Sequence, residues 1–192
     1  MNKFAQLARI LSHPRELRLA LSGLGVRLSG DDRFGGLAAD EIEGLCRWVG
    51  ASRPAAFVEI GTLFGFTARR IAALGVRTVA VDNFSWNPFG LSPAEHAAFT
   101  RRVLESTAVE LVDADAAEYL ASDRLPSAAF VFLDGDHRYE AVKAEIDLCL
   151  KAGVKFLAGH DYGNRSFGVA RAVDEAFGRP DETAGTCWLK RL

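Results

Sequence analysis

The most constraining feature of this chain is a segment in which an apolar run ends in a glycine-rich turn and continues as a helix. The run covers residues 57–60, the turn contains Gly61 and Gly65, and the helical pattern continues through residues 66–70. An apolar run of this kind is typical of a buried parallel strand. Glycine lets the backbone turn tightly and lets a ligand approach it, and the following helix presents free N–H groups at its start. The pattern predicts a binding site for an adenosine-containing cofactor at this turn.

Strands and helices alternate along the chain after residue 56, which predicts an α/β fold of the Rossmann-like, doubly wound type. Such a fold has one mostly parallel sheet with helices on both faces. The expected strands are 56–60, 78–81, 109–112, 129–133, 154–158 and 186–190. The expected helices are 38–49, 66–74, 93–105, 116–120, 139–150 and 167–177. We expect a single cofactor-binding domain over residues 38–192, preceded by a basic helical extension over residues 1–37.

Composition argues against several classes of protein. A formal net charge of −2 over 192 residues gives no electrostatic support for binding nucleic acid. No apolar run reaches the length of a membrane span. The three cysteines are widely separated and form no CxxC pair, so we expect reduced thiols and a cytoplasmic protein. The extension over residues 1–37 is expected to pack on the domain or on a second subunit, which would give a homodimer; contact of its basic residues with a membrane or RNA is the less favoured alternative.

Acidic residues follow the expected strands at regular positions. Each of the first five strands ends at or just before an acid, in the order Glu59, Asp82, Asp113 or Asp115, Asp134 and Asp161. Ligands bind outside the carboxyl ends of the strands in an open parallel sheet, so these acids are expected to line one site. Aspartate is also a preferred helix N-cap, and capping is the simplest alternative for Asp115.

The residues of the glycine turn distinguish between kinds of cofactor. Asp82 lies about twenty residues after the turn, where an acid accepts hydrogen bonds from a ribose diol. The dinucleotide fingerprint requires glycine at its third and sixth positions, which here are Leu63 and Phe66. These bulky side chains leave little room for a pyrophosphate at the helix start. A cofactor without phosphates is therefore favoured over a nicotinamide or flavin dinucleotide.

The turn also carries a family resemblance. The run Glu59-x-Gly61-x-x-x-Gly65, with Asp82 ending the next strand, resembles the cofactor signature of class I S-adenosylmethionine-dependent methyltransferases. Two further segments are similar to the small bacterial branch called methyltransferase domain 24. These segments are Phe132–Glu140, which contains Asp-Gly-Asp-His-x-Tyr, and Gly159–Tyr162. The resemblance spans residues 38–177, and the paired later segments are more specific than the glycine motif.

The resemblance implies a role for each matching residue. Glu59, Gly61 and Gly65 would line the methionine end of the cofactor, Asp82 would hold the ribose, and Asp115 would lie beside the adenine. The complete set expected to bind S-adenosylmethionine is Glu59, Gly61, Thr62, Gly65, Asp82, Asn83, Asp115 and Asp134. The family fold normally ends in an antiparallel pair of strands, and the tail after Phe177 is short for that pair.

A divalent cation is a second expected ligand. Asp134 and Asp161 would end neighbouring strands about 4.8 Å apart, and two converging carboxylates repel each other unless positive charge lies between them. Mg²⁺, with oxygen ligands at about 2.0–2.6 Å, is the default ion, held by Asp134, Asp161 and His160. In the alternative without metal, Arg138, His137 or a backbone N–H neutralises the acids.

The remaining histidines and the aromatic residues carry weaker expectations. His137 is the candidate general base, acting with Asp134, because its ordinary pKa of about 6.5 suits removal of a hydroxyl proton; a structural hydrogen bond is the alternative. His96 is expected at the surface. The loop after Asp82 contains Phe84, Trp86 and Phe89, which would form a lid or acceptor wall, or else fill the core beneath a loop.

Together these features predict an enzyme that transfers a methyl group from S-adenosylmethionine to a small-molecule acceptor, with oxygen as the favoured acceptor atom and a metal ion as a candidate helper. Two alternatives stay open. One is a dinucleotide-dependent oxidoreductase, which Leu63 and Phe66 disfavour. The other is a non-catalytic subunit that keeps the cofactor pocket and uses its basic N-terminal extension to bind a partner.

Overall fold

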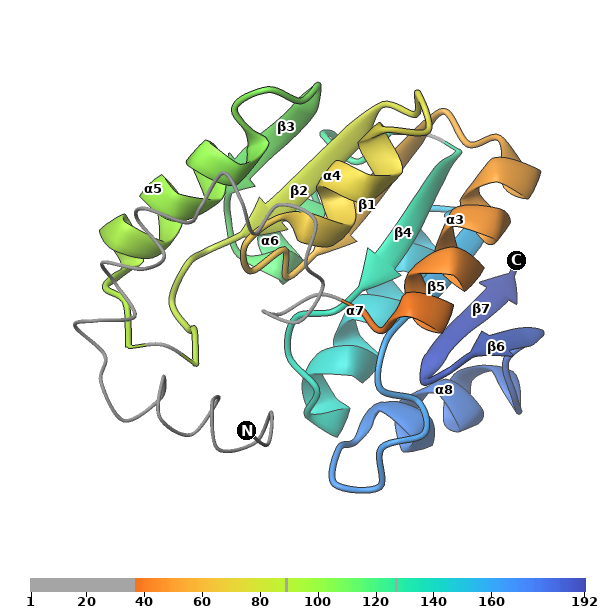
Figure 1. The fold of residues 1–192 in the computed structure, drawn as a ribbon. Coiled ribbons are helices and arrows are strands. Elements are labelled where there is room, and N and C mark those ends of the chain that lie inside the picture. Colours follow the sequence, from red (N-terminus) through yellow and green to blue (C-terminus); the bar gives the residue numbers. More distant parts are fainter. Residues whose placement is uncertain (1–36, 89, 127) are drawn as a thin grey trace, which may run out of the picture.

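A seven-stranded sheet forms the centre of the molecule in the computed structural model, which describes residues 37–88, 90–126 and 128–192 (Figure 1). The strand order is β3-β2-β1-β4-β5-β7-β6. The first five strands are parallel to one another, and β7 is antiparallel to both of its neighbours. The strands are β1 (Ala56–Ile60), β2 (Thr78–Asp82), β3 (Val109–Asp113), β4 (Ala129–Leu133), β5 (Phe156–Gly159), β6 (Glu182–Ala184) and β7 (Cys187–Arg191).

Helices cover both faces of this sheet, as the sequence predicts (Figure 1). They are α3 (Ala39–Ser52), α4 (Phe66–Ala72), α5 (Pro93–Leu104), α6 (Ala116–Leu120), α7 (Tyr139–Lys151) and α8 (Val169–Phe177). α3, α4 and α5 form one layer, and α6, α7 and α8 form the other. The doubly wound α/β architecture is therefore confirmed.

Alternation of side chains along the central strands supplies a hydrophobic core on each face. On β1, Val58 and Ile60 pack against residues of α6, α7 and α8. Phe57 points the other way and packs with Phe130 and Phe132 of β4 against α3 and α4. Successive residues of a strand point to opposite faces. A strand buried on both faces is thus apolar almost throughout, and the only acid within β1 is Glu59.

The C-terminal part of the sheet, from β5 to β6, differs from the sequence prediction in two places. A three-residue strand, β6, was not predicted; it pairs with β7, so the short tail does complete the antiparallel edge of the sheet. Glu182 of β6 also accepts a hydrogen bond of 2.8 Å from the indole of Trp48 on α3. The fifth strand begins at Phe156 rather than Val154, because the N–H of Val154 bonds to the carbonyl of Cys149 and continues the turn that ends α7.

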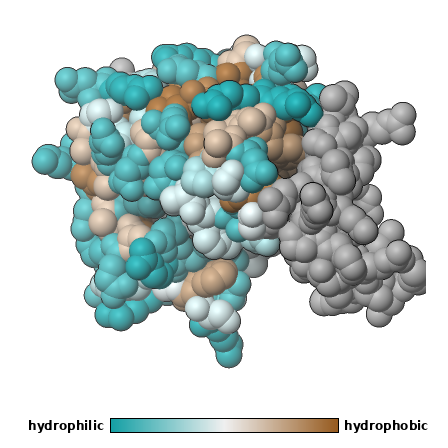
Figure 2. Space-filling view, turned by 90° about the vertical axis from the view of Figure 1, so that its left-hand side faces the viewer, coloured by the Kyte–Doolittle hydropathy of each residue, from teal (hydrophilic) through white to brown (hydrophobic). Residues whose placement is uncertain are grey.

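The surface of the described residues is mainly polar. In the space-filling view most of the visible face is hydrophilic, and its hydrophobic residues form small patches (Figure 2). Among the described residues, no helix has both the length and the apolar character needed to cross a bilayer. Of the predicted N-terminal extension over residues 1–37, residues 1–36 lie outside the described residues, as does Phe89 of the aromatic loop; Leu37 is described and is buried.

Candidate active site

A cleft of about 1090 Å³ opens at the carboxyl ends of the central strands. It collects nearly all of the residues that the sequence predicts for the site, although they come from five strand ends and the loops that follow. The predicted residues that line it are Glu59, Gly61, Thr62, Asp82, Asn83, Asp115, Asp134, His137, His160 and Asp161. Gly65 is the exception and does not line the cleft.

The glycine turn is required by close contacts on both sides. Gly61 has a φ of +82°, and a Cβ added there would lie 2.3 Å from the Cα of Gly135, so only glycine lets the loops after β1 and β4 touch. Gly65 has a φ of +80° and precedes the first residue of α4, where a Cβ would press into Leu104. Gly65 therefore shapes the turn from behind, and Gly61 forms the surface offered to a ligand.

Glu59 is buried beneath the turn. Its side chain accepts a hydrogen bond of 2.5 Å from the Thr62 hydroxyl. Burial raises the pKa of Glu59 to about 8, and the charges of Asp134 and Asp82 act in the same direction. A carboxyl in this setting holds its proton near neutral pH, and it lines the cleft as a hydrogen-bonding group rather than as a full charge.

Asp82 connects the two loops on its side of the cleft. One carboxylate oxygen accepts from the N–H of Leu63 at 2.8 Å, and the other accepts from the N–H of Phe84 at 2.7 Å. The next residue, Asn83, lines the cleft and accepts from the N–H of Ser85 at 3.0 Å. Asp82 thus fixes the conformation of the glycine turn, a task that its position in the sequence does not reveal.

Asp115 acts as a helix cap. One of its carboxylate oxygens accepts from the N–H groups of Ala117 and Glu118 at the start of α6. Capping was the alternative considered for this residue, and the geometry supports it. Both of these bonds use the same oxygen. Because Asp115 also lines the cleft, its other carboxylate oxygen is available to a ligand.

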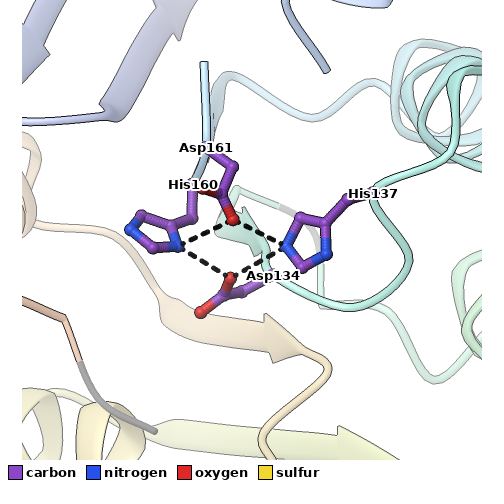
Figure 3. Close-up of side chains that lie close together, drawn as sticks. All are labelled: Asp134, His137, His160 and Asp161. Carbon is purple, nitrogen blue, oxygen red and sulfur yellow. Dashed lines mark ion pairs between the residues drawn. The ribbon is translucent and has the colours of Figure 1, made fainter. Parts of the chain in front are cut away.

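Two aspartates and two histidines form a compact cluster at the ends of β4 and β5 (Figure 3). His137 Nε2 lies 3.1 Å from an oxygen of Asp161 and 3.6 Å from an oxygen of Asp134. His160 Nδ1 lies 3.3 Å from the same oxygen of Asp134 and 3.4 Å from that of Asp161. The four atoms lie within 4.8 Å of one another. The structure therefore gathers Asp134, Asp161 and His160, as predicted for a metal site, and adds His137.

Glu41, on α3, anchors this cluster from behind. Its carboxylate accepts from both the N–H and the hydroxyl of Thr186, from the N–H of Ala38, and lies 3.2 Å from Nε2 of His160. If Nε2 carries the proton of that contact, Nδ1 of His160 presents its lone pair to the aspartates. Glu41 is buried, yet its pKa is lowered: burial raises it, and the hydrogen bonds from Thr186 and Ala38, with the charge of His160, outweigh that effect.

The aspartates raise the pKa of both histidines of the cluster. Burial alone would lower the pKa of His160, but Asp134, Asp161 and Glu41 outweigh it and raise the pKa to about 9. Asp134, followed by Asp161, also raises the pKa of His137 despite partial burial. Positive charge at this position is therefore strongly favoured, whether it is carried by protons on imidazole or by a cation.

Arg138 takes no part in neutralising the cluster. Its guanidinium pairs with Asp136 at 2.5 Å and is largely exposed. Within the alternative that needs no metal, the two imidazoles supply the positive charge beside Asp134 and Asp161, and the side-chain amide of Asn164 also donates a hydrogen bond of 3.3 Å to Asp161. The ring of His137 also stacks on Phe167, with 4.7 Å between centroids, at the margin of the cleft.

The surface prediction for His96 is wrong. The side chain is fully buried on the inner face of α5, and its Nε2 lies 2.8 Å from the carbonyl oxygen of Leu63. It packs edge-on against Phe64 and Phe84. His96, Phe99, Thr100 and Val103 are all buried on α5, and this helical spacing outweighs the polarity of the imidazole.

The aromatic loop divides between the two roles that the sequence left open. Phe84 is 2% exposed and fills the core beneath the loop. Trp86 is 69% exposed and lines the cleft. One aromatic residue therefore stabilises the loop, and the other is available to a ligand.

Comparison with known proteins identifies the family. The methyltransferase domain family matches residues 58–175, which is more than half of the chain and includes most of the cleft. The chain belongs to this family. No curated protein matches it significantly.

Solved structures share the fold of this methyltransferase. A protein from Klebsiella pneumoniae aligns with a TM-score of 0.61 at 17% identity, covering 95% of this chain and 89% of its own. The O-methyltransferase TomG from Streptomyces achromogenes, solved with S-adenosylmethionine, gives 0.59 at 18%, covering 88% and 87%. An O-methyltransferase from Bacillus cereus, solved with S-adenosylhomocysteine, gives 0.58 at 16%, covering 83% and 77%. These likenesses establish the class I methyltransferase fold.

Sequence reasoning missed two acids of this methyltransferase. Glu145 of α7 lines the cleft although it is 5% exposed. It lies on the same helix face as Val142, Ile146 and Cys149, which belong to the core. The hydrophobic pattern of this helix could have revealed Glu145, because an acid at a core position of an amphipathic helix is unusual. Glu41 sits beside the buried face of α3 in the same way, but its partner His160 is 119 residues away.

Proposed function

We propose that this methyltransferase binds S-adenosylmethionine in the cleft and transfers its methyl group to a hydroxyl oxygen of a small molecule. The observation that carries the proposal is the close contact of Gly61 with Gly135 at the strand ends of a methyltransferase domain, in a turn whose backbone is bound by Asp82 through the N–H of Leu63. It leaves bare backbone where a ligand can approach, and it lies beside the acidic cluster. The cofactor complexes of the TomG and Bacillus cereus O-methyltransferases support the choice of cofactor.

The proposed binding mode follows the order of the strand ends. Glu59, Gly61 and Thr62 contact the methionine portion, with Gly65 shaping the turn behind them. Asp82 and Asn83 bind the ribose, and Asp115 lies beside the adenine. Asp134 would contact the cofactor and is also a member of the cluster with His137, His160 and Asp161. Leu63 lines the cleft and occupies the position where a dinucleotide fold requires glycine, which argues against a pyrophosphate.

The reaction is an in-line displacement at carbon. The acceptor oxygen forms a bond to the methyl carbon as the carbon–sulfur bond breaks, the sulfonium becomes a neutral thioether, and the hydroxyl proton passes to a base. Aligning the acceptor with the sulfonium is the main task of such a site. Removal of the proton makes the oxygen a better nucleophile.

We further propose that Asp134, Asp161 and His160 hold a divalent cation. The donor atoms fit, because they converge within 4.8 Å and Glu41 directs Nδ1 of His160 toward the aspartates. A bound cation would lower the pKa of a coordinated hydroxyl. Mg²⁺ was the default expectation, but an imidazole donor favours ions such as Mn²⁺, Fe²⁺ or Zn²⁺.

His137 is assigned to proton transfer rather than to the ion. Its ring faces Asp161 through Nε2 and stacks on Phe167 at the margin of the cleft, whereas the ring of His160 is held from behind by Glu41. Replacement of His137 by Asn should reduce methyl transfer by about a hundredfold while Mn²⁺ affinity, measured by calorimetry, changes little. Asp161→Asn, the control, should weaken Mn²⁺ binding. Loss of Mn²⁺ binding in His137→Asn would instead make His137 a ligand.

Transfer of labelled methyl groups from S-adenosylmethionine to small molecules of a cell extract tests the function. Labelled product that disappears with excess S-adenosylhomocysteine is the expected result. Binding of the cofactor without transfer to any extract would favour the non-catalytic subunit. Binding of NAD⁺ in preference to the sulfonium compound would favour an oxidoreductase.

The cellular setting and assembly complete the proposal. The three cysteines are free thiols in the structure, which supports a reducing, cytoplasmic setting. We propose that residues 1–37 form an N-terminal extension that mediates a homodimer and that nucleic acid is not a partner. Because Leu37 is itself buried in the core beside α3, light scattering should compare the mass of the full chain with that of a chain lacking residues 1–36.

A further inference from the structure

One residue of the glycine turn has an unfavourable backbone conformation. Leu63, which lines the cleft, has a φ of +48°. In this left-handed region the Cβ of an L-residue crowds the following carbonyl oxygen, so leucine rarely adopts it. Such a conformation persists only where the surrounding structure holds it. The contacts of the Leu63 backbone therefore determine the shape of the turn.

Three hydrogen bonds hold the backbone of Leu63. Its N–H donates to Asp82 at 2.8 Å. Its carbonyl oxygen lies 2.8 Å from Nε2 of His96 and accepts from the Thr100 hydroxyl at 2.7 Å. His96 and Thr100 lie one turn apart on α5, and both are fully buried. Neither side chain lines the cleft, so they act on a ligand through the backbone that they bind.

Burying the imidazole of His96 carries an energetic cost. A carbonyl oxygen can only accept, so Nε2 carries the proton in the contact with Leu63. Nδ1 is then a buried lone pair, with no hydrogen-bond partner in the part of the chain that the structure describes, which is unfavourable. An apolar side chain would avoid that cost. The bond to Leu63 is what a histidine provides at this position.

We infer that His96 and Thr100 are positioning residues, which hold Leu63 in its left-handed conformation and thereby raise the affinity of the cleft for S-adenosylmethionine. The inference rests on the proposed function, in which this turn contacts the methionine portion of the cofactor. Without the two donors the turn populates other conformations, and the apparent affinity falls with the fraction that is competent to bind. A turn that is ordered before the ligand arrives avoids this loss.

Calorimetry with S-adenosylhomocysteine tests the inference on the full-length protein. Thr100→Val keeps nearly the same side-chain shape and removes one donor, and it should weaken binding by about fivefold. The double variant His96→Leu/Thr100→Val removes both donors and should weaken binding by about twentyfold. His96→Gln still offers an N–H donor and should bind within about threefold of wild type.

A matched control separates positioning from stability. Thr107 also donates its hydroxyl to a backbone carbonyl, that of Leu104 at 2.7 Å, just beyond the end of α5. Thr107→Val should lower the free energy of unfolding, as Thr100→Val does, but leave the affinity within about twofold of wild type. Equal losses of affinity in the two variants would contradict the assignment.

The variant Leu63→Gly gives a readout that a purely structural role would not change. Glycine adopts a positive φ without the penalty that leucine incurs. In this background the loss of affinity caused by Thr100→Val should therefore shrink to about twofold. An undiminished loss would show that Thr100 does not act through the conformation of Leu63.

The outcomes separate this inference from the proposed function. If the wild-type protein does not bind S-adenosylhomocysteine, both fail together. If the wild-type protein binds it and Thr100→Val binds it equally well, only the positioning role fails. Should the double variant prove unfolded, Thr100→Val, alone and in the Leu63→Gly background, still decides the matter.

Discussion

Asp82 illustrates how one residue of this site serves both the fold and the ligand. Its two oxygens hold the backbone of Leu63 and of Phe84, so the shape of the glycine turn depends on a residue at the end of another strand. A second role as ribose acceptor would use the remaining lone pairs of the same carboxylate, since each oxygen accepts more than one hydrogen bond.

Replacing Asp82 by Ala should therefore weaken binding of S-adenosylhomocysteine by at least about tenfold, or 1.4 kcal/mol. Both the ribose contact and the support of the turn are removed. Calorimetry measures the change. Asp113→Ala is the control, because Asp113 pairs with Asp82 across β2 and β3 but is exposed and does not line the cleft. Affinity within about twofold of wild type in Asp82→Ala would refute the ribose assignment.

At the scale of elements, α3 is joined to the site by Glu41. This residue links the start of α3 to Thr186, in the turn between β6 and β7, and to His160 after β5. The strands that complete the sheet edge therefore help to position a histidine of the cluster. Removing the Glu41 carboxylate should therefore weaken both the attachment of the β6–β7 turn to α3 and the positioning of His160.

Glu41→Ala should lower the free energy of unfolding by about 3 kcal/mol at pH 7, since several partly buried donors lose a charged, buried acceptor. Because the folded-state pKa of Glu41 is lowered, its ionisation favours folding above the unfolded-state pKa of about 4.3. That contribution disappears as the pH falls through the folded-state pKa. Urea unfolding should thus show a difference from wild type that narrows in acid. Glu43→Ala, exposed on the same helix, should show little change, and a pH-independent difference for Glu41→Ala would contradict the account.

The packing of α3 on the sheet edge gives a second test at this scale. A Cβ at Gly44 would lie 2.3 Å from the Cβ of Ala184 on β6, whereas a Cβ at Gly50 of the same helix would meet nothing within 4 Å. Gly44→Ala should destabilise the protein by about 1–3 kcal/mol through overpacking. Gly50→Ala should stabilise it by up to about 1 kcal/mol through helix propensity. Equal effects in thermal unfolding would show that α3 does not pack as described.

At the scale of the whole molecule, the sequence was sufficient for the layers but not for the details that depend on distant contacts. The alternation of short apolar segments with helical segments predicted the five parallel strands; β1 and β4 at the centre are buried throughout, whereas β3 at the edge is only partly buried. Three residues of β6 carry too little pattern to be recognised, and β6 forms only by pairing with β7. His96 was misplaced because its polarity was weighed above its position on the inner face of α5.

The candidate site shows the same limit. The acids at the strand ends were identified because parallel strands bring their carboxyl ends to one edge. Glu41 and Glu145 were not, since each stands on a helix and reaches the site only through the packing of that helix on the sheet. The contact of His137 with Asp161, between residues of two different loops, likewise exists only in the folded chain.

Isothermal titration of the full-length protein with S-adenosylhomocysteine, and separately with NAD⁺, tests the central claim most directly. The cleft described here should bind S-adenosylhomocysteine with micromolar affinity, about 8 kcal/mol, and should show no heat of binding with NAD⁺. Saturable binding of NAD⁺, with none of S-adenosylhomocysteine, would contradict the account.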